Sequence, residues 1–219
     1  MPEGPEEDRA PLGMTPDAVA RSYDALAEHW ASDRFPQQNG IAQHRRTIAF
    51  TTRRGKALDV GCGSSGRLIS LLRDQGFDAE GLDLSERMLE LARRCQPDVT
   101  FHRADVCRWQ PPARYDFISA WDSIWHVPLD QQEQVLRKLL VALAPGGVCI
   151  FTIGGLDAPD ETQNAAMGVP MYHAALGIPK TLEIVADTGC VCRHLEYDQY
   201  PELHVYLIVQ KRTVADEKS

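Results

Sequence analysis

The sequence predicts an α/β fold, in which helices cover both faces of a mostly parallel β-sheet. Short apolar runs alternate with stretches of helical periodicity along most of the chain, the pattern of parallel strands joined by helices. One apolar run, residues 58–60, leads directly into three closely spaced glycines, as a strand does at a strand-to-helix turn. The chain has 219 residues and no internal repeat or linker-like segment, so a single domain is expected.

Capping residues place the ends of several helices. Thr15 can cap a first helix that has Pro16 in its first turn, and apolar residues follow on one face as far as residue 30. Ser85 is expected to cap the helix that follows the second strand. Asp130 is expected to cap a helix with a long apolar face, and the Pro-Gly-Gly sequence at residues 145–147 is expected to stop it.

Apolar runs between these helices give the strands. Pro179 is expected to open a last helix that ends near Gly189, and a terminal hairpin follows. The first expected strand ends near residue 60 and the second ends near residue 82. The next five are expected at residues 99–102, 117–121, 148–153, 191–197 and 203–210.

The glycine-rich segment is the strongest functional signal. Gly61, Gly63 and Gly66 have the spacing of a dinucleotide-binding turn, and Asp83 lies close to where such a turn has its ribose-binding acid. Asp59 argues against a dinucleotide, because a carboxylate before the loop would repel a pyrophosphate at the helix N-terminus. A ligand with an ammonium group and no phosphate, such as S-adenosylmethionine, suits Asp59 better.

Several motifs in order resemble the class I S-adenosylmethionine-dependent methyltransferases, from about residue 15 to about residue 212. Within that family, the sequence most resembles small-molecule methyltransferases of the quinone-biosynthesis type. The resemblance implies a Rossmann-like, seven-stranded, mostly parallel sheet with helices on both faces and an antiparallel last strand. The matching segments are a cofactor loop at 58–63 that continues to Gly66 and includes Cys62, a ribose turn at 81–85, an adenine turn at 104–106, a fourth strand at 115–119 and a turn at 143–147.

The resemblance assigns expected roles around the adenosine. Asp83 is expected to accept hydrogen bonds from both ribose hydroxyls. Leu84 and Met88 could sandwich the adenine ring, although core packing also explains Met88. Asp105 could accept a hydrogen bond from the adenine amino group and Val106 could donate from its backbone, whereas a turn-capping role is the alternative for Asp105.

The amino-acid tail and the sulfonium have their own candidates. Asp59 is expected to serve the ammonium, directly or through water, or to brace the glycine loop. Backbone carbonyls near Ala120 and Trp121 could meet the same ammonium. Tyr23 and Trp30 lie on the helix that, by resemblance, closes over the cofactor, where aromatic rings could exclude water and favour the positive charge. Their alternative role is the apolar stripe of that helix.

An acceptor that begins protonated needs a base. His126 follows the fourth strand and is the first candidate, with a loop-fixing role as the alternative. Tyr172 and His173 are the next candidates. A metal held by His126, His173 and His204 is not expected, because no short ligand pattern is present.

The resemblance also organises the domain. Residues 14–212 are expected to form the methyltransferase domain, with a helical lid at 14–50 and an irregular substrate-side insertion at 154–178 over the acceptor pocket. Residues 1–13 are expected to be a disordered acidic tail, and residues 213–219 a polar tail.

Composition excludes some functions. The net charge of −8 argues against a nucleic-acid partner, and no apolar run is long enough to span a bilayer. Six cysteines without a small-scaffold pattern suit reduced thiols in a cytoplasmic protein, and a homodimer is left open.

The sequence therefore predicts a methyltransferase that acts on O, N or S of a small molecule by in-line displacement, with S-adenosylmethionine as the cofactor. Three alternatives stay open. They are an oxidoreductase that uses a nicotinamide cofactor, a non-catalytic module that binds S-adenosylmethionine, and a methyltransferase that detoxifies a thiol or metalloid and needs no base.

Overall fold

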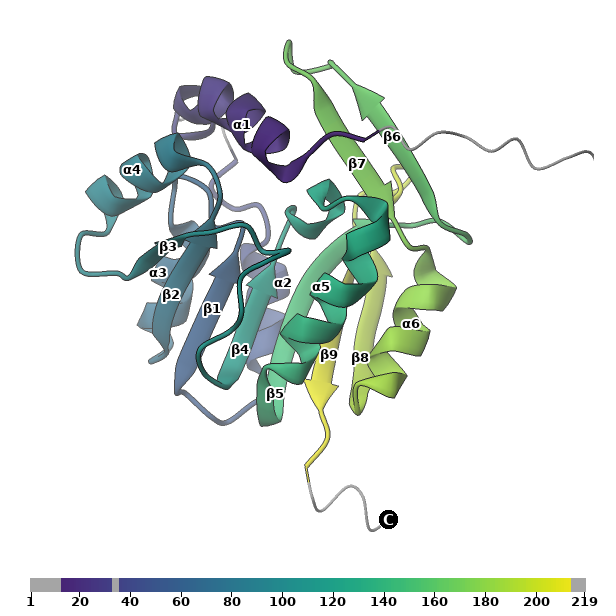
Figure 1. Ribbon diagram of the computed structural model, residues 1–219. Helices are drawn as coiled ribbons and strands as arrows, with labels where there is room; N and C mark the ends of the chain where they lie inside the picture. Colours follow the sequence, from purple (N-terminus) through teal and green to yellow (C-terminus); the bar gives the residue numbers. More distant parts are fainter. Residues whose placement is uncertain (1–12, 33–35, 214–219) are drawn as a thin grey trace, which may run out of the picture.

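A mixed β-sheet is the centre of the computed structural model, which describes residues 13–32 and 36–213 (Figure 1). Within these residues the strands of the sheet have the order β3-β2-β1-β4-β5-β9-β8. All neighbouring pairs are parallel except those of β9, which is antiparallel to both β5 and β8. The expected seven-stranded sheet with an antiparallel last strand is confirmed. The strands are β1 Lys56–Val60, β2 Asp78–Asp83, β3 Phe101–Arg103, β4 Tyr115–Ala120, β5 Leu143–Gly154, β8 Cys190–Tyr197 and β9 His204–Lys211.

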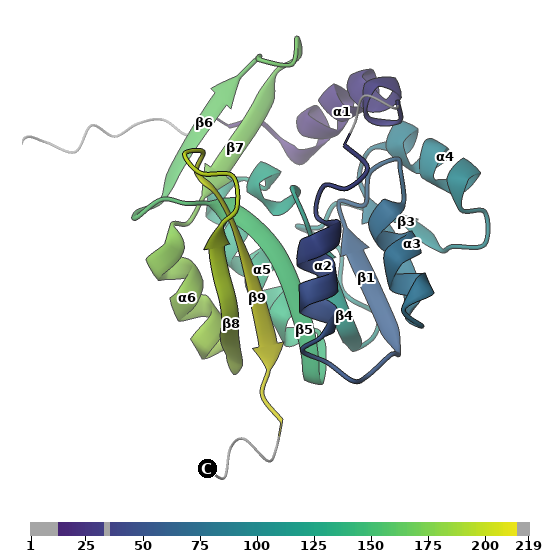
Figure 2. The same ribbon diagram turned by 180° about the vertical axis from the view of Figure 1, so that it is seen from behind.

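Helices cover both faces of this sheet. Helices α5 and α6 lie on the face seen in Figure 1, and α2 and α3 lie on the face seen in Figure 2. Strand side chains alternate between the two sides, so that Ile118 of β4 packs with the α5 and α6 residues and Phe117 packs with those of α2 and α3. The helices are α1 Pro16–Trp30, α2 Ile41–Ile48, α3 Arg67–Asp74, α4 Glu86–Cys95, the 3₁₀ helix η1 Ile124–His126, α5 Leu129–Val141 and α6 Ile178–Asp187.

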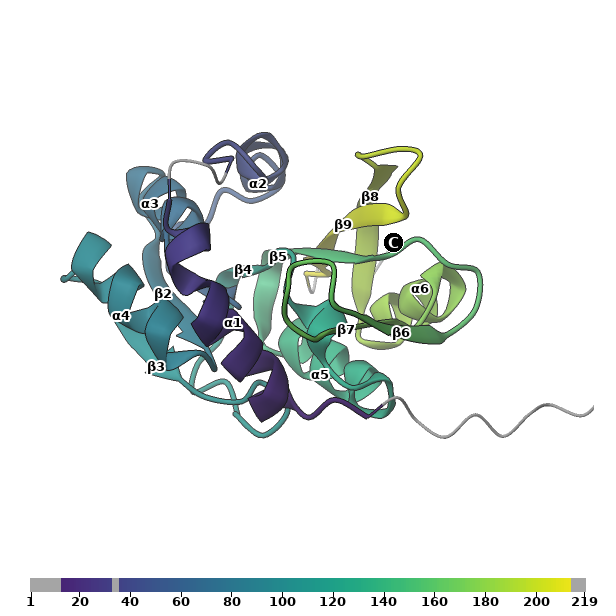
Figure 3. The same cartoon turned by 90° about the horizontal axis from the view of Figure 1, so that it is seen from above.

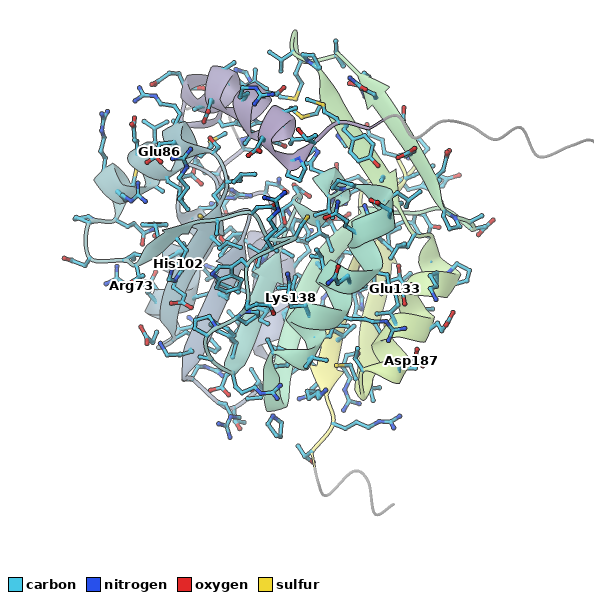
Figure 4. The ribbon with its side chains drawn as sticks, viewed as in Figure 1. Arg73, Glu86, His102, Glu133, Lys138 and Asp187 are labelled. Carbon is cyan, nitrogen blue, oxygen red and sulfur yellow. The ribbon has the colours of Figure 1, made fainter. Side chains whose placement is uncertain are left out.

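Side-chain contacts on the outer side of α5 hold it to α6. Arg137 binds Glu133 at 2.8 Å and Asp187 at 2.9 Å, and Glu133 and Asp187 lie on the two neighbouring helices (Figure 4). These pairs are exposed, so each contributes little to stability.

Two of the predicted helix caps are confirmed and one is wrong. Thr15 Oγ1 accepts a hydrogen bond from the Ala18 N–H at 3.3 Å, and Ser85 Oγ accepts one from Met88 at 3.1 Å. Asp130 does not cap α5, because the helix begins one residue earlier, at Leu129, and Pro128 occupies the cap position. Asp130 lies in the first turn, where its negative charge favours the helix dipole.

The Pro-Gly-Gly sequence does not stop the preceding helix. Helix α5 already ends at Val141, and β5 begins at Leu143, so Pro145–Gly147 lies inside the strand. The pairing with β4 shifts register between Tyr115 and Phe117, and Gly146 has a φ of 78°. The glycine therefore accommodates an irregularity in the strand rather than a helix end.

The segment expected to be irregular contains a second, two-stranded antiparallel sheet. Strands β6, Asp160–Asn164, and β7, Met171–Ala175, form this hairpin. This hairpin was not predicted, because β6 consists of polar residues and is mostly exposed. The sequence did not predict helix α2 separately either, since five of its eight residues are polar.

Helix α1 and the β6–β7 hairpin lie side by side over the carboxyl ends of the central strands (Figure 3). Ser22 Oγ of α1 donates a 2.7 Å hydrogen bond to the Pro170 carbonyl of the hairpin. Val19 of α1 packs in one apolar cluster with Met171 and Tyr172 of β7. We call α1 together with the hairpin the roof.

The expected tails fall largely outside the described residues, which exclude 1–12 and 214–219. No helix in the described part of the chain is sufficiently long and apolar to cross a membrane.

Candidate active site

A cavity of about 290 Å³ lies between the roof and the carboxyl ends of β1, β2 and β4. This is the edge of the sheet where strand order reverses between β1 and β4, the usual ligand position in such folds. The predicted site residues that line the cavity are Tyr23, Trp30, Gly61, Cys62, Gly63, Asp83, Leu84, Met88, Asp105, Val106, Trp121 and His126. The predicted residues outside the lining are Asp59, Gly66, Ala120, Tyr172 and His173.

Each glycine of the loop is required for a different reason. All three have positive φ, at 70° for Gly61, 61° for Gly63 and 60° for Gly66. A Cβ on Gly61 would lie 2.3 Å from the Ser123 Cβ, and one on Gly66 would lie 2.4 Å from Gln96 Nε2. A Cβ on Gly63 would meet no atom within 4 Å. Gly63 therefore keeps its side of the loop open toward the cavity.

Asp83 is held by the backbone through both carboxylate oxygens. Oδ2 accepts the Gly63 N–H and Oδ1 accepts the Ser85 N–H, each at 2.9 Å. Burial raises the pKa of Asp83, and these backbone hydrogen bonds oppose the shift. Each oxygen retains a second lone pair, so the fixed carboxylate can accept two hydrogen bonds from a vicinal diol.

Asp105 has the turn-capping role, and the adenine contact stays a prediction. Its Oδ1 accepts the Cys107 N–H at 2.8 Å, which is a turn cap, and the residue also lines the cavity. Leu84, Met88 and Val106 line the same end of the cavity. The side chain of Met88 is at the same time part of the buried interior.

Asp59 lies below the cavity floor and is buried. Ser119 contacts its carboxyl group and also lies 2.9 Å from His44 Nε2. The Ser119 hydroxyl has one proton and can donate it to Asp59 or to His44, but not to both. The other hydrogen bond therefore needs a proton on Asp59 or His44. Burial raises the pKa of Asp59 to about 6 and lowers that of His44 to about 4. Asp59 thus belongs to a buried network that supports the loop from behind.

Replacing Asp59 with asparagine is expected to change how stability depends on pH. Because the pKa of Asp59 is higher in the folded state, its ionisation costs stability as pH rises from about 4 to about 6. Relative to the parent, the variant should therefore gain roughly 2–3 kcal/mol in unfolding free energy between pH 4 and pH 7.

Urea unfolding at several pH values measures this gain. The exposed Asp78→Asn replacement is the control and should show no comparable trend. A difference between Asp59→Asn and the parent that stays constant from pH 4 to pH 7 would contradict the prediction.

A pair of opposite charges that was not predicted from the sequence lies at the far end of the cavity. Arg67, in the first turn of α3, and Asp122, directly after β4, both line it. Asp122 accepts hydrogen bonds from His204 Nε2 at 2.9 Å and from Asn39 Nδ2 at 3.0 Å. The Arg67 Nε donates to the Asn39 carbonyl at 3.0 Å. Together they can bind a carboxylate and an ammonium group.

Two signals could have found this pair. An arginine in the first turn of a helix is unfavourable for the helix dipole, which indicates another role for Arg67. Asp122 follows a central strand at its carboxyl end, where ligands bind in such sheets. Asp122 also has a φ of 51°, a strained conformation of the kind that gathers at functional sites.

His126 has a defined tautomer. Its Nδ1 lies 2.7 Å from the Tyr172 carbonyl, which can only accept, so Nδ1 carries a proton. Its Nε2 accepts from the Tyr23 hydroxyl at 2.7 Å and from Trp125 Nε1 at 3.0 Å. Burial lowers the pKa of His126 to about 4, so the ring is neutral at pH 7. The Tyr23 hydroxyl donates to His126 and keeps its oxygen lone pairs for the cavity.

The two remaining catalytic candidates act differently from what was expected. The Tyr172 hydroxyl donates to Glu161 at 2.5 Å and accepts from the Leu129 N–H, and the residue contributes only its carbonyl to His126. The His173 ring lies beside His126, tilted by 50° with 4.8 Å between centroids, and His173 is not part of the cavity lining. Among residues 13–32 and 36–213, no three His, Cys, Asp or Glu side chains are placed to hold a metal ion.

Comparison with known proteins identifies clear relatives. A family model described as a methyltransferase domain matches residues 36–183. The chain is 31% identical over 153 residues to the malonyl-[acyl-carrier protein] O-methyltransferase of Enterobacter lignolyticus (strain SCF1), covering 68% of this chain and 58% of that protein. It is 38% identical over 126 residues to the trans-aconitate 2-methyltransferase of Rhizobium meliloti (strain 1021), covering 54% of this chain and 48% of that protein. The chain thus spans about half the length of the curated relatives it matches.

A solved structure shares the fold. The crystal structure of the 1,6-didemethyltoxoflavin-N1-methyltransferase of Burkholderia thailandensis superposes with a TM-score of 0.69 at 17% identity. The match covers 93% of this chain and 92% of that one. That structure was obtained with 1,6-didemethyltoxoflavin and S-adenosylhomocysteine bound.

Proposed function

We propose, on the premise that this chain belongs to the methyltransferase family, that it transfers a methyl group from S-adenosylmethionine to O, N or S of a small molecule. One observation carries the proposal. A single cavity brings together the doubly anchored Asp83, the opposite charges of Arg67 and Asp122, and the Tyr23–His126 pair. Adenosine, amino-acid tail and methyl acceptor each find a matching group there.

The cavity fits the cofactor group by group. Gly63 leaves open space beside Asp83, where a ribose can approach the backbone closely. Arg67 suits the carboxylate of the methionine tail and Asp122 suits its ammonium. This proposal moves the ammonium contact from Asp59 to Asp122 and keeps for Asp59 its other expected role, that of bracing the loop.

Bound S-adenosylmethionine would supply a methyl group on a good leaving group, so the protein has mainly to hold the acceptor in line and exclude water. The roof serves this purpose: Val19 and Tyr23 of α1 and Met167 of the hairpin line the cavity from above.

The Tyr23–His126 pair can take a proton from the acceptor. As the acceptor O–H or N–H bond breaks, its proton passes to the Tyr23 oxygen and the Tyr23 proton passes to His126 Nε2. The tyrosine hydroxyl is restored and His126 becomes the cation. Burial lowers the proton affinity of His126, but loss of the sulfonium charge on methyl transfer favours the imidazolium that forms.

Binding and turnover assays test the proposal. Calorimetry with S-adenosylhomocysteine is expected to give binding, and the same titration with NAD⁺ is expected to give none. Labelled S-adenosylmethionine with a panel of phenols, amines and thiols is expected to give at least one methylated product. Binding of NAD⁺ alone would favour the oxidoreductase, and cofactor binding without turnover would favour the non-catalytic module. Methylation of thiols only would favour the detoxifying enzyme.

Lys138 is expected to support the adenine end of the cavity from α5, where Figure 4 labels it. Its Nζ donates to the carbonyls of Val106 at 2.5 Å and Cys107 at 3.2 Å. Lys138→Met removes both charge-assisted hydrogen bonds and should loosen this turn. The Kd for S-adenosylhomocysteine should rise roughly 3–10-fold. Calorimetry measures the change.

The control for Lys138→Met is Lys180→Met, because Lys180 lies on α6 and forms surface ion pairs with Glu133 and Glu183. An equal loss of affinity in both variants would rule out a specific role for Lys138.

The remaining sequence-based expectations belong to this proposal. The net charge of −8 supports a small-molecule rather than a nucleic-acid acceptor. All six cysteines are free, which suits a cytoplasmic location. Light scattering after size exclusion would decide whether the chain forms a homodimer. The quinone-biosynthesis subtype stays a prediction.

A further inference from the structure

The roof and η1 build the part of the cavity wall that the cofactor does not need. Asp83 and Asp105 suit the nucleoside, and Arg67 and Asp122 suit the amino-acid tail. The remaining wall includes Pro16, Val19 and Tyr23 from α1, Ile124, Trp125 and His126 from η1, and Met167 from the hairpin, with their chain neighbours Ala20, Ser123 and Val127. We call this wall the acceptor wall.

The acceptor wall carries no formal charge at pH 7, and the cavity as a whole is negative. Of the described residues that line the cavity, one is an arginine and three are aspartates, a formal charge of −2. S-adenosylmethionine, with a sulfonium, an ammonium and a carboxylate, carries +1 and would leave about −1. Arg67 lies at the opposite end, next to Asn39 and under the field of Asp59 and Asp122. A carboxylate at the acceptor wall would therefore lose its hydration without gaining a counter-charge from the lining residues that the structure describes.

The polar side-chain atoms of Tyr23, Trp125 and His126 are paired with one another, whereas the neighbouring Ser123 Oγ is buried with no hydrogen-bond partner among the described residues. Trp125 Nε1 and the Tyr23 hydroxyl both donate to His126 Nε2. The wall therefore offers aromatic surface and the lone pairs of the Tyr23 oxygen. The rings of Tyr23, Trp125 and His126 stand edge to face, at 5.3 Å between Tyr23 and His126 and 6.1 Å between Trp125 and His126. Such a corner suits a flat ring that carries a hydrogen-bond donor.

From this wall we propose that the methyl acceptor is an uncharged aromatic compound with an O–H or N–H group, and that acceptors bearing carboxylates are excluded. The inference rests on the proposed function and names its substrate class. It separates this chain from the relative named for trans-aconitate, an acceptor with several carboxylates. A protonated amine is excluded as well, because it has no lone pair to receive the methyl group.

The test measures binding to protein saturated with S-adenosylhomocysteine, using intrinsic tryptophan fluorescence and calorimetry. The probes are matched pairs with one ring and one added charge, such as methyl 4-hydroxybenzoate against 4-hydroxybenzoate, together with trans-aconitate. The neutral member is expected to bind at least about 10-fold more tightly at pH 7, and trans-aconitate is expected not to bind. Turnover with labelled S-adenosylmethionine should follow the same order.

A charge-reversal variant tests the cause. Met167 is 39% exposed at the hairpin tip and lines the cavity, so lysine can replace it without disturbing the core. Met167→Lys should tighten binding of the carboxylate member about 10-fold. The difference in Kd between the neutral and the carboxylate member, which we call the gap, should therefore become smaller. Met167→Gln, of similar length and uncharged, should leave the gap unchanged.

Three outcomes would overturn the inference. They are carboxylates that bind the parent as tightly as their neutral partners, binding of trans-aconitate, or failure of every neutral phenol and aniline of the panel to bind. If S-adenosylhomocysteine itself does not bind, the proposed function fails first, so the two failures are distinguishable.

Discussion

Replacing Asp83 with alanine is expected to weaken binding of S-adenosylhomocysteine by about 100–1000-fold. The carboxylate is positioned by the Gly63 and Ser85 N–H groups and offers one free lone pair on each oxygen to the ribose. Two charge-assisted hydrogen bonds of this kind contribute about 3–5 kcal/mol together. Calorimetry at pH 7.5 measures the change directly.

Two further variants show whether the effect is specific. Asp83→Asn should also bind S-adenosylhomocysteine poorly. The NH₂ group of asparagine can only donate, and it would replace an oxygen that accepts hydrogen bonds from a backbone N–H and from a ribose hydroxyl. Asp24→Asn is the control, since Asp24 binds Ser85 Oγ and the Arg87 N–H nearby without lining the cavity. If Asp83→Ala binds the ligand within threefold of the parent, the proposed ribose contact is wrong.

Replacing Tyr23 with phenylalanine is expected to lower turnover of a protic acceptor about 100-fold or more while the Kd for S-adenosylhomocysteine stays within about threefold. The variant keeps the aromatic ring and removes only the hydroxyl that connects the acceptor to His126 Nε2. Proton transfer by a positioned group contributes in this range. Steady-state kinetics and calorimetry on the same preparations separate the two effects.

The partner variant His126→Ala should show a similar loss, and the double variant should be little worse than either single one, because the two residues act as one unit. Since the pKa of His126 is lowered to about 4, its neutral form predominates at pH 6–8, and the activity that depends on it should fall only as pH drops toward 4. A thiolate acceptor has no proton to lose, so the Tyr23 and His126 variants should methylate it at nearly the rate of the parent. Fully additive losses would argue against a shared proton path.

Those parts of the site that depend on consecutive residues were predictable. The glycine loop needs positive φ at three nearby positions, and Asp83 and Ser85 terminate one strand and begin one helix. Such local demands appear directly in the sequence. The alternation of strands and helices likewise predicted the sheet, and even its antiparallel last strand followed from the resemblance.

The contacts that complete the site join segments that are far apart in the sequence, so no local sequence pattern predicts them. Tyr23 and His126 are 103 positions apart and meet because α1 crosses above the end of β4. From the sequence, Asp59 could either serve the ammonium or brace the glycine loop, because it precedes the glycines, and its burial is visible only in the fold. The β6 strand has no apolar alternation, because neither of its faces enters the core, and the hairpin was therefore expected to be irregular.

The roof consists of two pieces that touch each other through Ser22 and Pro170 but belong to neither the central sheet nor the glycine loop. On the proposed function, much of the acceptor wall comes from the roof, with η1 completing it, while the cofactor contacts come from the loops at the ends of the strands. A change of acceptor can arise by altering residues 13–32 or the hairpin while the groups that grip adenosine keep their positions. The same scaffold is thereby open to divergence toward new small molecules through insertions at one edge.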